Sequence, residues 1–135
     1  MKLIKNAKIV TMEGRDYDNG YIIIDGSHIH SLGAMTDLPE PDDAFSEIYD
    51  AEGAMALPGF VDAHCHVGMW AEGAGIEGSD GNEMTGTLQP QLRAIDSINP
   101  ADPAFAEALA AGVTTAVTGP GSGNVLGGQF AAVKT

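Results

Sequence analysis

Two histidines separated by one residue, His64 and His66, are the side chains in this sequence best suited to bind a metal ion. Alternate side chains of a strand share a face, and the rise of ~3.3 Å per residue places these imidazoles ~6.6 Å apart along it. From that spacing both rings can tilt toward one zinc ion, at Zn–N distances of about 2.0–2.1 Å. Asp62 shares their face and is predicted to orient an imidazole from outside the ligand set. Cys65 faces the other way and is expected to pack as a small apolar side chain.

The alternative is a pair of polar side chains at a strand end that only water contacts. The segment His28-Ile29-His30 shows that spacing alone does not identify a metal site, because it repeats the same pattern. It follows Asp25-Gly26, a dipeptide typical of tight hairpin turns, in which Gly accepts the positive φ. Alternation in the next strand predicts both histidines on the solvent face and Ile29 in the core.

The elements that must position these residues fall into two parts, predicted as domains 1–56 and 57–135. Residues 1–56 hold short apolar or alternating runs between turn signals, which predicts a small sheet. The second part begins with a strand, predicted to be buried at Phe60-Val61, that ends in the histidines. A Gly-rich and acidic stretch precedes a helix that starts at Asp102-Pro103 and stops at Gly112, followed by a β-branched strand over 113–118. This order of strand, helix and strand predicts an α/β fold with a parallel sheet or barrel.

The Gly-rich segment 119–128 follows a strand, as a phosphate-binding loop would. The spacing G-x-G-x-x-G fails, because its third glycine would fall on Asn124, and no Gly-Lys-Ser/Thr follows. A phosphate or nucleotide binder is therefore the least favoured function. At the mouth of a barrel site, Asn124 and Gln129 would be available as hydrogen-bond donors to a substrate.

Charge excludes further classes of partner. The chain has 19 acidic and six basic residues, a net charge of −13, and no Lys or Arg between Arg15 and Arg93. Such a surface repels nucleic acid and anionic membranes. The single cysteine, Cys65, excludes an internal disulfide, and no apolar run approaches the ~20 residues of a membrane span. With no secretory signal at Met1, we expect a cytoplasmic protein.

Residues 57–66, LPGFVDAHCH, resemble the first barrel strand of the amidohydrolase superfamily, typically P-G-[FLM]-[IV]-D-x-H-x-H, at every fixed position. Residues 2–12, 20–33 and 49–57 are similar to the small composite β-sandwich of these enzymes. Residues 107–118 are similar to their first barrel helix and second strand. The resemblance is greatest to the imidazolonepropionase-like branch, including members with a segment like TGPGSGNVLGGQ.

The resemblance implies a (β/α)8 TIM barrel with its site at the carboxyl ends of the strands. His64 and His66 would bind Zn²⁺, alternatively Mn²⁺ or Fe²⁺, and a metal-activated water would hydrolyse a C–N bond of a small molecule, a non-peptide or dipeptide amide, possibly cyclic. The family's other ligands come from later strands, so we expect the remainder of the barrel in cis or trans and a homo-oligomer at full length. Alone, the chain is expected to be an inactive fragment; the alternative is a non-catalytic β-sandwich interaction module.

The sequence departs from imidazolonepropionases in the loop after the histidines. Those enzymes typically carry an Arg soon after the motif, whereas here none occurs before Arg93. The loop instead holds four acids, which suit a cationic or neutral substrate or are simply solvated: Glu72, Glu77, Asp80 and Glu83. Met69 and Trp70 follow the histidine pair and are expected to line the pocket or to pack in the core.

Overall fold

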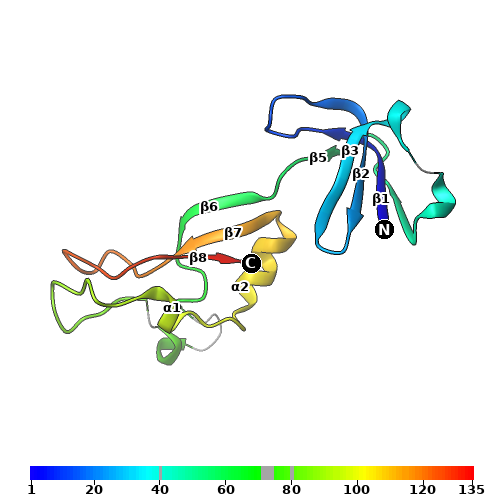
Figure 1. Cartoon of the computed structure of the whole chain (residues 1–135). Helices are drawn as coiled ribbons and strands as arrows, with labels where there is room; N and C mark the ends of the chain where they lie inside the picture. The colour runs from blue at the N-terminus through cyan, green and yellow to red at the C-terminus, as the bar shows by residue number, and fades with distance from the viewer. Residues whose placement is uncertain (40, 71–74, 80) are drawn as a thin grey trace. The chain divides into compact units, whose positions relative to one another are not determined.

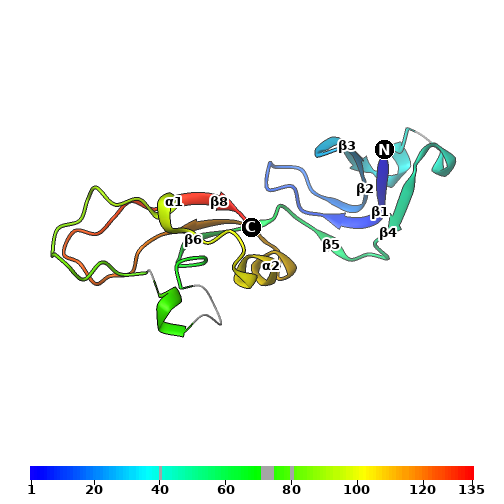
Figure 2. The same cartoon turned by 90° about the horizontal axis from the view of Figure 1, so that it is seen from below.

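The computed structural model describes residues 1–39, 41–70, 75–79 and 81–135. It divides the chain into two compact units, Met1–Pro58 and Gly59–Thr135, where the sequence places the boundary between residues 56 and 57. Figures 1 and 2 show the elements of each unit in two views. Within the described ranges, no helix is both long and apolar enough to cross a membrane.

The first unit is a five-stranded sheet built around its first strand. β1 pairs antiparallel with β2, β2 pairs antiparallel with β3, and β4 and β5 both run parallel to β1. The β2–β3 hairpin turns at Gly26, whose φ of 58° confirms the predicted turn. The bounds of the strands are β1 Lys2–Ile9, β2 Tyr17–Asp25, β3 His28–Ala34, β4 Glu47–Asp50 and β5 Met55–Ala56. Two short 3-10 helices, Met35–Asp37 and Asp42–Ala44, lie between β3 and β4.

Alternation along β1 and β2 buries one face of this sheet. Leu3 and Ile23 are paired across the two strands and are each 1% exposed, in a core cluster with Tyr21 and Phe45. Ile29 is 63% exposed, so its predicted place in the core is wrong. β3 is an edge strand with a register shift beside Ile29, and this side chain lines an open apolar groove. His28 and His30 are exposed, as predicted.

The second unit holds a three-stranded sheet in the order β6-β7-β8. β6 (Phe60–Cys65) and β7 (Val113–Thr118) are parallel, and α2 (Pro103–Ala110) lies in the connection between them. The Asp102 carboxylate accepts a hydrogen bond from the Ala104 N–H at 2.9 Å, and Gly112 has a φ of 89°, which confirms both predicted ends of the helix. A 3-10 helix (Gly75–Gly78) and a short helix α1 (Ala94–Ser97) precede it.

The third strand was not predicted. β8 (Ala131–Lys134) runs antiparallel to β7, whereas the sequence pattern predicts parallel strands only. The described residues of the second unit thus form an open sheet rather than a closed barrel. β6 is an edge of this sheet, and Phe60 and Val61 are 57% and 62% exposed. Their predicted burial is not met in this chain because β6 pairs with a described strand on one side only.

Candidate functional site

His64 and His66 lie together where β6 ends. Their ring centroids are 5.4 Å apart and their planes meet at 82°. The strand does not run regularly to this point, because β6 advances three residues, from Asp62 to Cys65, while β7 advances two, from Ala116 to Thr118. The irregularity brings the Asp62 Oδ1 within 3.1 Å of the His64 backbone N–H, which donates to it. Asp62 therefore contacts the backbone of His64, where the sequence predicts a contact with an imidazole.

The orientation of His66 follows from one hydrogen bond. Its Nδ1 lies 2.7 Å from the carbonyl oxygen of Gly119, the residue after β7. A carbonyl oxygen only accepts, so Nδ1 carries the hydrogen and donates, and the Nε2 of the neutral ring keeps its lone pair. Metal-binding histidines generally hold their second ring nitrogen in this way. The Gly119 N–H in turn donates to the Cys65 carbonyl at 3.2 Å.

Two aromatic side chains flank the histidines. Phe130, which directly precedes β8, lies with its ring centroid 5.0 Å from that of His64 and 6.4 Å from that of His66. Trp70 packs edge-on against His66, at 5.0 Å and 73°. Sequence reasoning singled out Trp70 but missed Phe130. The one feature that could have pointed to Phe130 is a strand over 131–134, because that strand brings the chain back beside β7.

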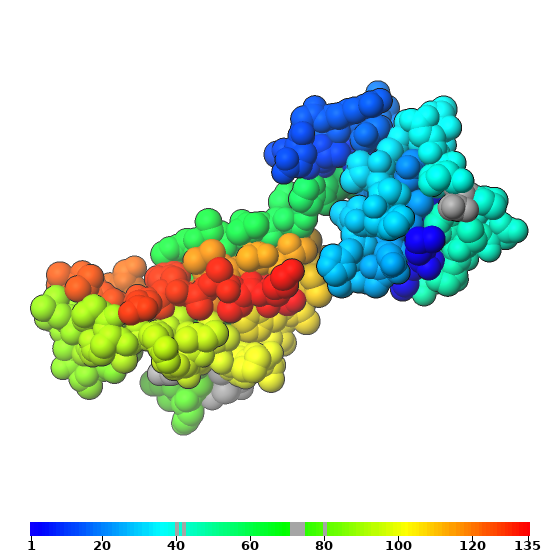
Figure 3. Space-filling model, viewed as in Figure 1, coloured from blue at the N-terminus to red at the C-terminus, as the bar shows by residue number. Residues whose placement is uncertain are grey.

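Two segments that follow β6 and β7 run side by side, residues 81–94 and 119–130, here called the paired loops (Figure 3). Backbone bonds join them: the Gln89 N–H donates to the Leu126 carbonyl at 2.7 Å, and the Leu126 N–H donates to the Thr87 carbonyl at 3.2 Å. The Asn124 side-chain amide donates to the carbonyls of Glu83 and Gly86, at 2.8 and 2.6 Å.

The amide of Gln129 donates in the same way to the Pro90 carbonyl, at 3.2 Å. The structure thus places Asn124 and Gln129, the two predicted substrate donors, in contacts that join the paired loops. The Gly-rich segment is engaged as well: Gly121 and Gly123 donate their N–H groups to the Gly81 carbonyl and the Asn82 Oδ1. A strand follows this segment rather than a helix, so it does not form the phosphate-binding arrangement weighed from the sequence.

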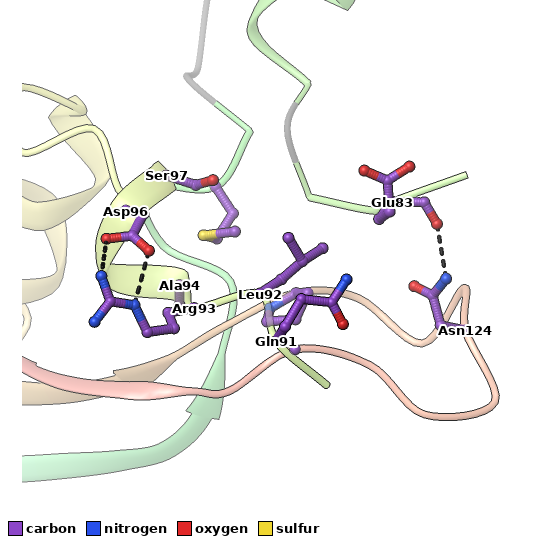
Figure 4. A pocket seen from close by; sticks show the side chains of 11 residues that line it. Glu83, Gln91, Leu92, Arg93, Ala94, Asp96, Ser97 and Asn124 are labelled. Atoms are coloured by element: carbon purple, nitrogen blue, oxygen red, sulfur yellow. Dashed lines mark hydrogen bonds and ion pairs between the residues drawn. The ribbon is translucent and has the colours of Figure 1, made fainter. Parts of the chain in front are cut away.

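A small cavity of about 190 Å³ opens between the paired loops and the residues that follow the histidines (Figure 4). Met69, which is buried, and Pro120, next to Gly119, contribute to its wall. Arg93 and Asp96 form a two-pronged ion pair at its rim, with nitrogen–oxygen distances of 2.9 and 2.7 Å. Hydrogen bonding to Arg93, with its charge, lowers the pKa of Asp96.

The same pair raises the pKa of Arg93. Glu83 also lines the cavity, and hydrogen bonds from Thr85 lower the pKa of its carboxyl. Glu77 is exposed on the 3-10 helix. The other two loop acids considered from the sequence, Glu72 and Asp80, lie outside the described residues.

Across the described ranges, no group of three or more His, Cys, Asp or Glu side chains is placed to hold a metal ion. His64 and His66 therefore form a pair of candidate ligands rather than a complete set. Cys65 adds nothing to it, because its thiol lies 3.6 Å from the Val117 carbonyl oxygen, within the β6–β7 pair.

No family model matches the sequence. Among solved structures, the chain is similar to an amidohydrolase from Thermotoga maritima MSB8, with 39% sequence identity and a TM-score of 0.83. The match covers 99% of this chain and 33% of that one. The chain belongs to the amidohydrolase superfamily. A match over 99% of the chain takes in nearly all of both units.

Curated relatives agree with this assignment. The amidohydrolase tasK of Hapsidospora irregularis is 39% identical over 95 residues, which are 70% of this chain and 9% of that protein. An imidazolonepropionase of Acinetobacter baumannii is 38% identical over 68 residues, or 48% of this chain and 16% of that protein. A 5-methylthioadenosine/S-adenosylhomocysteine deaminase of Pelotomaculum thermopropionicum is 42% identical over 69 residues, 50% of this chain and 16% of that protein. The chain thus spans 9–16% of the length of these curated relatives.

Proposed function

We propose that His64 and His66 are two ligands of a catalytic divalent metal, Zn²⁺ or alternatively Mn²⁺ or Fe²⁺, in a hydrolase that acts on C–N bonds. The observation that carries the proposal is the His66 hydrogen bond to Gly119, which leaves Nε2 free to bind, beside a second imidazole 5.4 Å away. The relatives' names support the reaction class, because they include amidohydrolases and deaminases.

The residues present fit such a metal in kind but not in number. Neutral imidazole nitrogens are ligands that Zn²⁺, Mn²⁺ and Fe²⁺ accept, and a catalytic zinc site ordinarily has three protein ligands. His64 and His66 supply two, and the described residues add no third. We propose that the missing ligands come from later strands of a (β/α)8 barrel, in cis or in trans. In that barrel β6 and β7 are the first two parallel strands, and their carboxyl ends carry the site.

When bound, the metal supplies an activated water and polarises the bond to be cut. The chain's own residues prepare the site. Gly119 holds the Nδ1 hydrogen of His66, and Asp62 holds the backbone of His64. The ring of Phe130 packs beside that of His64, and the ring of Trp70 packs edge-on against that of His66. The substrate would be a small amide, amidine or dipeptide, neutral or cationic because the net charge of −13 disfavours anions.

The chain offers a matched test of the metal site. The double variant His64→Ala/His66→Ala removes both proposed ligands, and His28→Ala/His30→Ala removes an exposed pair of the same spacing. Zn²⁺ affinity and metal content are measured for both variants and for the unmodified protein. We expect the first variant to bind Zn²⁺ more than about 100-fold more weakly, beyond the 10–100-fold typical of losing an outer contact, and the second to bind as the unmodified protein does.

Equal losses in the two double variants would mean that histidines bind Zn²⁺ nonspecifically, and would refute the proposed site. A protein that holds the later barrel strands and still binds no Zn²⁺ would favour the non-catalytic interaction module. Ring opening of imidazolones, release of ammonia from deoxyadenosines and release of amino acids from dipeptides test the reaction class. An absence of turnover in a full-length protein that holds metal would contradict hydrolysis of these C–N bonds.

A further inference from the structure

We propose that Gly119 and Phe130 act together as positioning residues for the two histidines. The carbonyl of Gly119 orients His66, and the missing side chain of Gly119 gives Phe130 the space from which its ring orients His64. This inference rests on the proposed metal site for its purpose. Its geometry can be measured on the metal-free protein.

Gly119 is a fixed acceptor for His66. Its N–H donates to the Cys65 carbonyl at 3.2 Å, which extends the β6–β7 pairing beyond the end of the strands. Its carbonyl accepts from the His66 Nδ1 at 2.7 Å. The backbone is therefore held on both sides of the Gly119 Cα, by Cys65 at the end of β6 and by the side chain of His66, so the imidazole has a partner of fixed position.

His64 is held differently. It is exposed, and among the described residues neither of its ring nitrogens has a hydrogen-bond partner. Its aromatic neighbours among the described residues are His66, with ring centroids 5.4 Å apart, and Phe130, at 5.0 Å and 37°. Because His66 is itself held by Gly119, Phe130 is the aromatic neighbour through which the paired loops restrict rotation of the His64 ring. Phe130 is 38% exposed, so its neighbours do not enclose the ring completely.

Gly119 couples the two contacts by steric means. A Cβ added there would overlap the ring of Phe130. Gly119 is not among the glycines of positive φ, so this residue is needed for space and not for its backbone torsion. The paired loops then bring Phe130 back, since the chain leaves β7 at Gly119 and re-enters the sheet at β8. One small residue thus serves His66 through its carbonyl and His64 through the space above its Cα.

The test uses Gly119→Ala and Phe130→Ala, with Gly127→Ala as the matched control. Gly127 lies in the same loop, has nothing within 4 Å of an added Cβ, and is not among the positive-φ glycines. Long-range ¹H–¹⁵N spectra of the metal-free protein report the ring nitrogen that carries hydrogen in each histidine, and NOEs report the contact of Phe130 with His64. Circular dichroism confirms that each variant is folded.

In the unmodified protein we expect His66 to carry its hydrogen on Nδ1 and NOEs to join His64 and Phe130. Both alanine substitutions, at Gly119 and at Phe130, are expected to abolish those NOEs and to weaken Co²⁺ binding by 10–100-fold, the range for a contact outside the ligand set. Phe130→Leu keeps apolar volume without the ring, so its Co²⁺ affinity is expected to lie between those of Phe130→Ala and the unmodified protein. Gly127→Ala is expected to match the unmodified protein in Co²⁺ affinity and in the NOEs.

Two results would overturn the positioning role: a His66 that carries its hydrogen on Nε2, or Co²⁺ affinity unchanged in folded Gly119→Ala and Phe130→Ala. A different result distinguishes failure of the proposed metal site from failure of the positioning role. The metal site is refuted if the protein binds no Co²⁺ even when the later barrel strands are present. The positioning of the rings is supported if the tautomer and the NOEs are found in the unmodified protein and the NOEs are lost in these variants.

Discussion

Asn124→Ala tests whether this side chain joins the paired loops or serves a substrate. The side-chain amide donates to the carbonyls of Glu83 and Gly86, at 2.8 and 2.6 Å, and it is partly buried. Each such hydrogen bond contributes a net ~0.5–1.5 kcal/mol. Asn124→Ala removes both hydrogen bonds and leaves each of the two carbonyls with one partner fewer. We expect this loss to destabilise the paired loops by about 1–3 kcal/mol.

Native-state hydrogen exchange measures this opening directly, because it reports the free energy of local unfolding. The N–H groups of Gln89 and Leu126, which bond across the paired loops, are the probes. A loss of about 1–3 kcal/mol corresponds to exchange faster by about 5- to 150-fold. Backbone amides of the first unit, such as that of Ile23, are expected to keep their protection, since they belong to a separate compact unit.

Val125→Ala is the matched control, because Val125 is next to Asn124 in the sequence and is itself 85% exposed. We expect exchange at Gln89 and Leu126 to stay within a factor of about two in this variant, as surface substitutions usually change stability by less than ~0.5 kcal/mol. Unchanged exchange in Asn124→Ala would refute the joining role. Weaker substrate binding with unchanged exchange would instead support the donor role predicted from the sequence.

Three further substitutions test the packing and the charges. Ile23→Ala, in the core of the first unit, is expected to lower the free energy of unfolding by about 2–5 kcal/mol, measured by urea denaturation. Gly59→Ala would drive its Cβ into the Thr114 side chain, and we expect faster hydrogen exchange in β6, with partial rescue by adding Thr114→Ala. Arg93→Gln removes the partner that lowers the pKa of Asp96, so a ¹³C titration should show that pKa rising toward its ordinary ~3.9. In the unmodified protein the ion pair stabilises the folded state at neutral pH. This contribution is lost as the pH falls through the lowered pKa of Asp96.

Features of the second unit that depend on neighbouring residues were predicted correctly. The ends of α2 follow from Asp102, whose carboxylate caps the first turn, and from Gly112, which accepts a positive φ. The strands β6 and β7 were likewise expected from β-branched and apolar runs. In each case the deciding interaction lies within a few residues along the chain, so its chemistry can be read from the sequence.

Features that depend on distant partners were missed. β8 spans only Ala131–Lys134 and has no strong pattern, because its strand conformation comes from pairing with β7. Phe130 reaches His64, 66 residues earlier, only as a result of that pairing. Exposure of Phe60 and Ile29 was also missed, since burial depends on what covers a strand and not on the strand's own residues.

The sequence by itself determined the kinds of side chain at the candidate site, the superfamily motif that contains them and the acidic charge of the chain. Only the tertiary structure decided which carbonyl meets His66, which ring covers His64 and which carbonyls take up the amide of Asn124. The physical reason is that motif chemistry belongs to the covalent chain. A hydrogen bond or a ring contact between distant residues exists only once strands have paired and loops have closed, and many alternative partners are available until then.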